Sequence, residues 1–88
     1  MKRHALIIGV NTYKDKRITP LNAAVQDAID MYGLLLNGLA FDQVRILLQE
    51  QATQAEVLEA VRELVADLDS DDLFILYFAG HGLSLIHI

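Results

Sequence analysis

A histidine flanked by two glycines, Gly80-His81-Gly82, follows the most hydrophobic run of the sequence. If that run is a buried strand, the imidazole stands at the rim of a sheet, where a substrate can reach it. Such a histidine could act as general base toward a thiol and as general acid toward a leaving amine. The neighbouring glycines carry no Cβ that would block a peptide, and the Gly82 amide could point at a developing oxyanion. On these residues alone, a plain strand-end turn is the more common arrangement.

Four aspartates are further candidates for chemistry, although each has a simpler explanation. Asp27 lies near the start of an expected helix, where a carboxylate stabilises the helix dipole by about 0.3–1 kcal/mol. Asp69, Asp71 and Asp72 suggest calcium, yet they lack the spacing of an EF-hand loop, and turn chemistry accounts for them. We therefore predict no metal site in these residues.

Composition excludes several classes of function. The 88 residues contain no cysteine, so they hold no disulfide, no thiolate metal ligand and no thiol nucleophile. The net charge is -5, and the seven basic residues form no patch that could follow a phosphate backbone, which argues against a nucleic-acid partner. No apolar run approaches the roughly 20 residues of a membrane helix. We expect a soluble, cytoplasmic protein that has no membrane partner.

Three short apolar runs alternate with two amphipathic segments, which is the order of a parallel α/β sheet built from β-α-β units. The runs at 5–10, 44–48 and 73–78 are apolar at nearly every position, as strands covered on both faces must be. The sequence therefore predicts three parallel strands and two helices. In such sheets, sites lie outside the carboxyl ends of the strands. The segments 11–20, 49–53 and 79–82 are accordingly expected to lie at one edge.

Both predicted helices show apolar residues at steps of three and four. The first is expected at about 22–37, with Gly38 as its stop. The second begins after Thr53, because Thr53 and Glu56 have the spacing of a capping box. Its apolar stripe comprises Val57, Val61, Leu64 and Leu68.

Taken together and in order, these segments resemble the caspase and metacaspase superfamily over residues 5–82. The resemblance is carried by the first strand with Asn11 and Tyr13, by Leu21 with Asp27-Ala28, and by a strand that ends in Gly80-His81-Gly82. It implies a three-layer caspase-like fold in which His81 pairs with a cysteine at the end of the following strand. The resemblance also implies that the Gly82 amide is an oxyanion donor. A cysteine-type endopeptidase acting on peptide or protein substrates is thus expected.

The resemblance gives Asp27 a role that its position alone does not. In metacaspases the aspartate of this segment lines the pocket for the residue that precedes the scissile bond. A carboxylate there selects arginine or lysine through a charge-assisted hydrogen bond. Aspartate-specific caspases have an arginine a few residues earlier, near Leu21 here. No cofactor is implied, although some metacaspases require calcium, and fused regulatory domains are compatible with the family. The alternative is a non-catalytic caspase-like interaction module.

The last six residues, Leu83 to Ile88, carry no turn or helix signal, and they are what the end sequence of a transposase-based sequencing adapter encodes. We therefore expect residues 1–82 to be the N-terminal part of a caspase-like domain and residues 83–88 to be a non-native tail. A native apolar strand is the alternative, and the nucleotide sequence decides between them. On the first expectation the chain lacks its cysteine, is inactive by itself, and exposes an unpaired edge on its third strand.

Overall fold

The computed structural model describes residues 1–11 and 24–80 and contains three strands and two α-helices in the predicted order. None of its helices in this part of the chain is long and apolar enough to cross a membrane. The elements, in chain order, are β1 (Arg3–Gly9), α1 (Ala24–Gly33), the π-helical turn η1 (Leu34–Gly38), β2 (Gln43–Leu48), the 3-10 turn η2 (Gln49–Gln51), α2 (Gln54–Val65) and β3 (Leu73–Ala79).

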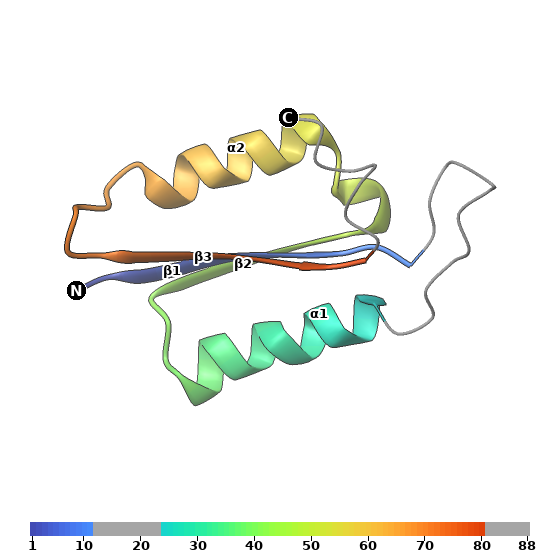
Figure 1. Cartoon of the computed structure of the whole chain (residues 1–88), viewed down its shortest axis with the longest axis horizontal. Coiled ribbons are helices and arrows are strands. Elements are labelled where there is room, and N and C mark those ends of the chain that lie inside the picture. Colours follow the sequence, from blue (N-terminus) through green and yellow to red (C-terminus); the bar gives the residue numbers. More distant parts are fainter. Residues whose placement is uncertain (12–23, 81–88) are drawn as a thin grey trace.

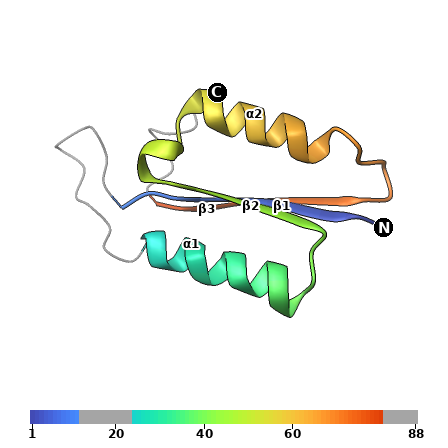
Figure 2. The same cartoon turned by 180° about the vertical axis from the view of Figure 1, so that it is seen from behind.

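The three strands form one parallel sheet in the order β2-β1-β3, with α1 on one face and α2 on the other (Figure 1). The view from behind shows the same three layers (Figure 2). The first crossover leads from β1 to one neighbour, and the second passes back over β1 to the opposite side. Because both crossovers are right-handed, this reversal puts the two helices on opposite faces. The predicted α/β fold class, a partial three-layer caspase-like fold, is confirmed.

The core lies on both faces of the central strand β1, whose side chains alternate between the two helices. Leu6 and Ile8 belong to the cluster on the α2 side, together with Val57, Ala60 and Leu64. On the α1 side the cluster consists of residues from β1, α1, η1, the segment before β2, and β3: Ala5, Ile7, Ala24, Ala28, Leu35, Phe41 and Ala79. Burial on both faces explains why the run at 5–10 is apolar without alternation.

The first helical segment ends at Gly38, as predicted, but its last turn is π-helical and not α-helical. The α-helix closes at Gly33 and widens into η1, where the Leu39 N–H donates to the Leu34 carbonyl at 2.9 Å. The left-handed residue is Ala40, with φ 52°. The wide turn returns Phe41, which is 6% exposed, to the core. Burial of this aromatic ring holds the chain against the sheet after the helical segment. The predicted start at residue 22 lies outside the described residues.

The second helix begins as predicted and ends earlier than the apolar stripe indicated. The Thr53 Oγ1 accepts a hydrogen bond from the Glu56 N–H at 3.2 Å, which caps the first turn. The helix stops at Val65, so Leu68 is not part of its stripe, and the Leu68 N–H donates to the Val65 carbonyl in a following turn. Aspartates precede and follow Leu68, and negative charge is unfavourable at a helix C-terminus.

Gly9, the last residue of β1, allows α1 to lie unusually close to the sheet. A Cβ atom at this position would be 2.6 Å from the Ala28 Cβ and 3.2 Å from the Ala24 carbonyl oxygen. Real Cβ atoms do not approach this closely, so any larger residue would push the first turns of α1 away from β1. Gly9 is therefore required by packing and not by its own backbone angles.

We expect Gly9→Ala to lower the free energy of unfolding by about 1–3 kcal/mol, because the added methyl group overpacks the contact with Ala28. Gly33→Ala is the matched control, since nothing lies within 4 Å of a Cβ there and the backbone is helical. That substitution should instead stabilise by about 0.5–1 kcal/mol. Urea unfolding followed by circular dichroism measures both. A Gly9→Ala protein as stable as the parent would contradict the close approach.

Candidate active site

The three strands end level with one another at their carboxyl edge. In the parallel register, Gly9 of β1 lies beside Leu48 of β2 and Ala79 of β3. Beyond this point the Val10 N–H still donates to the Ala79 carbonyl at 3.1 Å. The residues that follow the three strands therefore leave the sheet from one edge.

The strand order reverses at β1, between its neighbours β2 and β3. The chain leaves β1 toward β2 on one side, and it arrives at β3 on the other side. In open α/β sheets, ligands bind where neighbouring strands send their connections in opposite directions. The segments that follow β1 and β3 begin with Val10-Asn11 and with Gly80, so these residues lie at the carboxyl edge where the strand order reverses.

Asn11 ties this edge to the start of α1. Its backbone N–H donates to the Gln49 Oε1 at 2.8 Å, and its own Oδ1 accepts from the Val25 N–H at 2.9 Å. Gln49, directly after β2, has a left-handed backbone with φ 54°. The sequence predicted that the segments containing Asn11 and Gln49 lie at one edge, but it did not predict the hydrogen bond between them. The bond to Val25 spans 14 positions, so no local capping pattern could have revealed it.

Asp27 lies in the first turn of α1, and Figure 1 shows that this helix begins at the end of the molecule where β1 ends. Ala24 and Ala28 are buried against the sheet, which holds this turn in place, whereas Asp27 is exposed. Its carboxylate has no hydrogen bond or ion pair with any described residue. Asp27 is thus an exposed carboxylate, unpaired within the described part of the chain, at the helix end that Asn11 anchors.

Gly80 is the last described residue before the candidate histidine. Its φ of 154° belongs to a region that residues with a side chain rarely adopt. A glycine is therefore needed at this position if the chain is to leave β3 along this path. His81 and Gly82 themselves lie outside the described residues, as does Tyr13.

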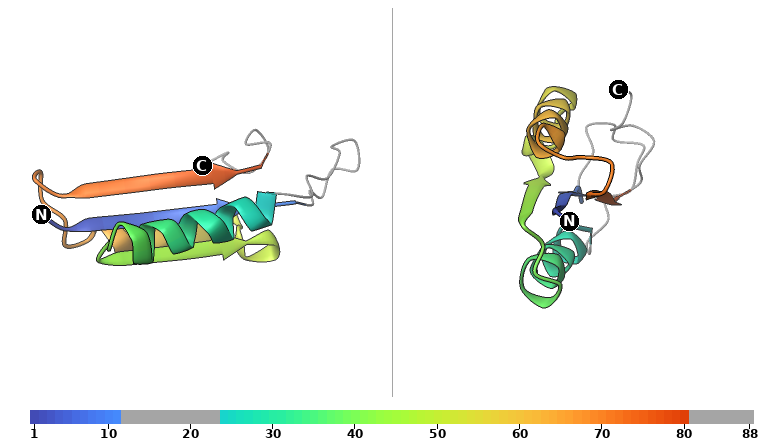
Figure 3. Two further views of the ribbon diagram at one scale, coloured as in Figure 1. Left: turned by 90° about the horizontal axis from the view of Figure 1, so that it is seen from below. Right: turned by 90° about the vertical axis from the view of Figure 1, so that its left-hand side faces the viewer.

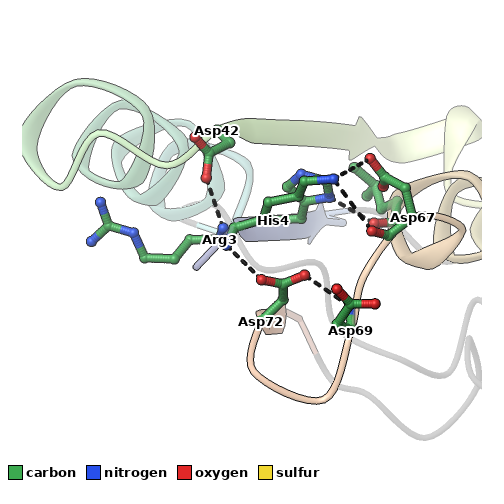
Figure 4. Close-up of polar contacts among 8 residues, drawn as sticks. Arg3, His4, Asp42, Asp67, Asp69 and Asp72 are labelled. Atoms are coloured by element: carbon green, nitrogen blue, oxygen red, sulfur yellow. Dashed lines mark hydrogen bonds and ion pairs between the residues drawn. The ribbon is translucent and has the colours of Figure 1, made fainter.

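The acidic residues that suggested calcium lie at the opposite, amino edge of the sheet. Asp72 accepts hydrogen bonds from the Asp69 N–H at 2.8 Å and from the Lys2 N–H at 2.7 Å. Figure 4 shows this aspartate beside the start of β1, where Asp42 in turn accepts from the Arg3 N–H at 2.8 Å. These carboxylates fix the ends of strands and turns. Among the residues that the structure describes, no group of three or more His, Cys, Asp or Glu side chains could hold a metal ion.

Hydrogen bonds shift the pKa of three groups at this amino edge. The bond from the Asp69 N–H, followed by that from Lys2, lowers the pKa of Asp72. The Lys2 Nζ, 3.0 Å from the Asp67 Oδ2, lowers the pKa of Asp67, and its own pKa is raised by the same bond. His4 lies next to them, 2% exposed, with its Nδ1 2.7 Å from the Leu64 carbonyl oxygen. This buried histidine joins β1 to α2 and is remote from the carboxyl edge.

Residues 2–87 match the sequence profile of the caspase domain, and the chain therefore belongs to the caspase domain family. The parallel sheet with a helix on each face agrees with that assignment.

Within this family the chain is similar to metacaspases. It is 33% identical to Metacaspase-1 of Saccharomyces cerevisiae over 92% of its own length and 20% of that protein. It is 27% identical to Metacaspase-1 of Schizosaccharomyces pombe over the same shares, and 28% identical to Metacaspase-4 of Arabidopsis thaliana over 97% of its own length and 22% of that protein. The chain thus spans about a fifth of the length of these relatives.

We expect Asn11→Ala to destabilise the chain by about 1 kcal/mol, because the first turn of α1 loses the oxygen that caps the Val25 N–H. Asn11→Asp keeps an oxygen acceptor and should remain close to the parent. Asn37→Ala makes the same chemical change at an exposed position of η1 and should cost nothing measurable. Thermal unfolding compares the three variants, and equal melting temperatures for Asn11→Ala and Asn37→Ala would refute the cap.

A second prediction concerns pH and Asp72. Because the folded chain lowers the pKa of this carboxyl below its ordinary value of 3.8, its stabilising contribution is complete above that value and is lost as the pH falls below it. Asp72→Asn should therefore be less stable than the parent at pH 7, and the difference should shrink as the pH falls below 3.8. Asp71→Asn, at an exposed site that has no described partner, should match the parent throughout. Urea midpoints measured against pH provide the comparison.

Proposed function

We propose that this chain is the histidine-bearing part of a cysteine-type endopeptidase domain. The observation that carries the proposal is the carboxyl edge of the sheet in this member of the caspase domain family: β1 and β3 end there side by side, and the sequence continues from β3 into Gly80-His81-Gly82. Gly80 supports it, because its backbone conformation excludes other residues directly before the histidine.

In this proposal, His81 takes the proton of a cysteine thiol supplied by a further strand of a longer polypeptide. The thiolate attacks the scissile carbonyl, and the Gly82 N–H stabilises the oxyanion that forms. His81 then gives its proton to the leaving amine, and water hydrolyses the acyl-enzyme. The 88 residues contain no cysteine, so we expect no turnover from this chain alone.

We further propose that Asp27 selects arginine or lysine before the scissile bond. The carboxylate is exposed and unpaired among the described residues, and it belongs to the helix end that Asn11 holds at the carboxyl edge. A guanidinium or ammonium group binding there would gain a charge-assisted hydrogen bond. An aspartate side chain at the same point would be repelled, which favours basic over acidic substrates.

The test extends the native reading frame beyond Gly82 and assays the longer polypeptide with fluorogenic peptides that end in arginine, lysine or aspartate. We expect cleavage after the two basic residues, and His81→Ala should reduce kcat/KM by at least about 1000-fold. Asp27→Asn should reduce it by roughly 10- to 100-fold for arginine peptides, since one charged hydrogen bond is lost.

Two outcomes would contradict the proposal in different ways. A longer polypeptide without a cysteine after the next strand, and without turnover, would indicate a non-catalytic interaction module of the same family. Cleavage that survives His81→Ala would remove the assigned base. If Asp27→Asn lowers kcat/KM equally for arginine and aspartate peptides, the proposed role of Asp27 in specificity is wrong. The proposed peptidase activity would not be affected by that result.

A further inference from the structure

Gln49, the residue directly after β2, has a backbone conformation that residues with a side chain rarely adopt. Its φ is 54°, in the left-handed region where the Cβ atom crowds a backbone carbonyl oxygen. Glycine would adopt the same conformation without strain. Strained residues persist where other interactions hold them in place, and they are concentrated at functional sites. A glutamine at this position therefore needs a side-chain interaction that offsets the strain.

The side chain of Gln49 makes such an interaction with the segment that follows β1. The Val10 N–H donates to the Ala79 carbonyl of β3, and backbone groups alternate in direction along a strand, so the Asn11 N–H points to the β2 side. There the chain has already turned away from the sheet, and the Gln49 Oε1 accepts this N–H at 2.8 Å. Figure 3 shows that the turn after β2, the end of β1 and the start of α1 lie at the same end of the molecule.

Asn11 connects Gln49 to the first turn of α1. The Asn11 Oδ1 accepts from the N–H of Val25, the second residue of the helix, at 2.9 Å. An N–H in the first turn of a helix has no partner within the helix, so this oxygen takes the place of a helical carbonyl. Asp27 belongs to the same turn, two positions further on. Two consecutive hydrogen bonds therefore lead from Gln49 to the turn that carries Asp27.

We propose that Gln49 is a positioning residue, which through Asn11 holds the first turn of α1 and thereby the Asp27 carboxylate in place. The action of Asp27 on a basic substrate side chain rests on the proposed function, whereas the connection from Gln49 to α1 does not. Gln51 provides the contrast within the same turn. Its Oε1 accepts from the Leu48 N–H at 3.2 Å, three positions away, so this bond stays local.

The connection can be tested by amide hydrogen exchange, followed by NMR, in the 88-residue chain. Gln49→Gly removes the side-chain oxygen but also relieves the left-handed backbone, so its thermal unfolding midpoint should stay close to that of the parent. The N–H groups of Asn11 and Val25 should nevertheless exchange at least about tenfold faster. Gln49→Glu keeps an oxygen acceptor on a side chain of the same length and should retain the parent rates within about threefold. Gln51→Ala, the matched control, should leave both amides unchanged.

The effect on Asp27 can be tested in the longer polypeptide with peptides that carry arginine or citrulline before the scissile bond. Citrulline has nearly the shape of arginine without its charge. Gln49→Gly should lower the ratio of kcat/KM for arginine over citrulline at least about fivefold. In an Asp27→Asn background the same substitution should change this ratio no further, because no carboxylate remains to be positioned. A merely structural disturbance would slow cleavage of both peptides equally.

Each outcome separates this proposal from the proposed peptidase activity. Unchanged exchange at Val25 in Gln49→Gly, or fast exchange that persists in Gln49→Glu, would overturn the connection. Faster exchange with an unchanged ratio of arginine to citrulline cleavage would overturn the effect on Asp27 and leave the peptidase activity in place. If the longer polypeptide cleaves neither peptide, the proposed function and the role of Asp27 toward a substrate are wrong, and the exchange rates still decide whether Gln49 holds α1.

Discussion

Strand β1 is covered on both faces and paired on both edges, and the other described elements take their positions from it. Ala5, Leu6 and Ile7 are fully buried, because α1 packs on one face of β1 and α2 packs on the other. At its end, Gly9 lets the backbone of α1 approach within a distance that no other residue permits. Because parallel strands need long crossovers, this central position also decides which faces the helices occupy and where the connections meet.

Much of this arrangement could be predicted from the sequence because burial on two faces leaves a strong signal. Unbroken apolar runs identified the strands, and the Thr53 cap identified the start of α2. The end of the first helical segment at Gly38 was predicted as well, whereas the change from α- to π-helix after Gly33 and the return of Phe41 to the core were not. The extent of α2 was overestimated because Leu68 matched the spacing and the neighbouring aspartates were not weighed against the helix dipole.

In the candidate site, too, features set by neighbouring residues could be predicted from the sequence, whereas contacts between distant residues could not. The place of Asp27 near a helix start was visible in the sequence, whereas its anchoring through Asn11 was not. That anchor depends on a hydrogen bond from the Val25 N–H to the Asn11 Oδ1, 14 positions apart, and on Gln49 from a third segment. The carboxylates at the two edges of the sheet also differ in their hydrogen-bond partners. At the amino edge, backbone N–H groups donate to Asp42 and Asp72, while at the carboxyl edge none of the described residues donates a hydrogen bond to Asp27. This contrast separates structural from candidate functional acids more clearly than their spacing in the sequence does.

The open edge of β3 matters for the site because the candidate histidine follows this strand. A catalytic side chain must be held within a fraction of an ångström and within narrow angles of its reactive geometry, which requires a rigid supporting element. In the described residues β3 is bonded along one side only, and its outer N–H and C=O groups depend on whatever joins them. A partner along that side would restrict the strand and with it the direction in which Gly80 leaves the sheet. We therefore expect that a strand paired with the outer side of β3 also helps to hold the candidate site in its reactive geometry.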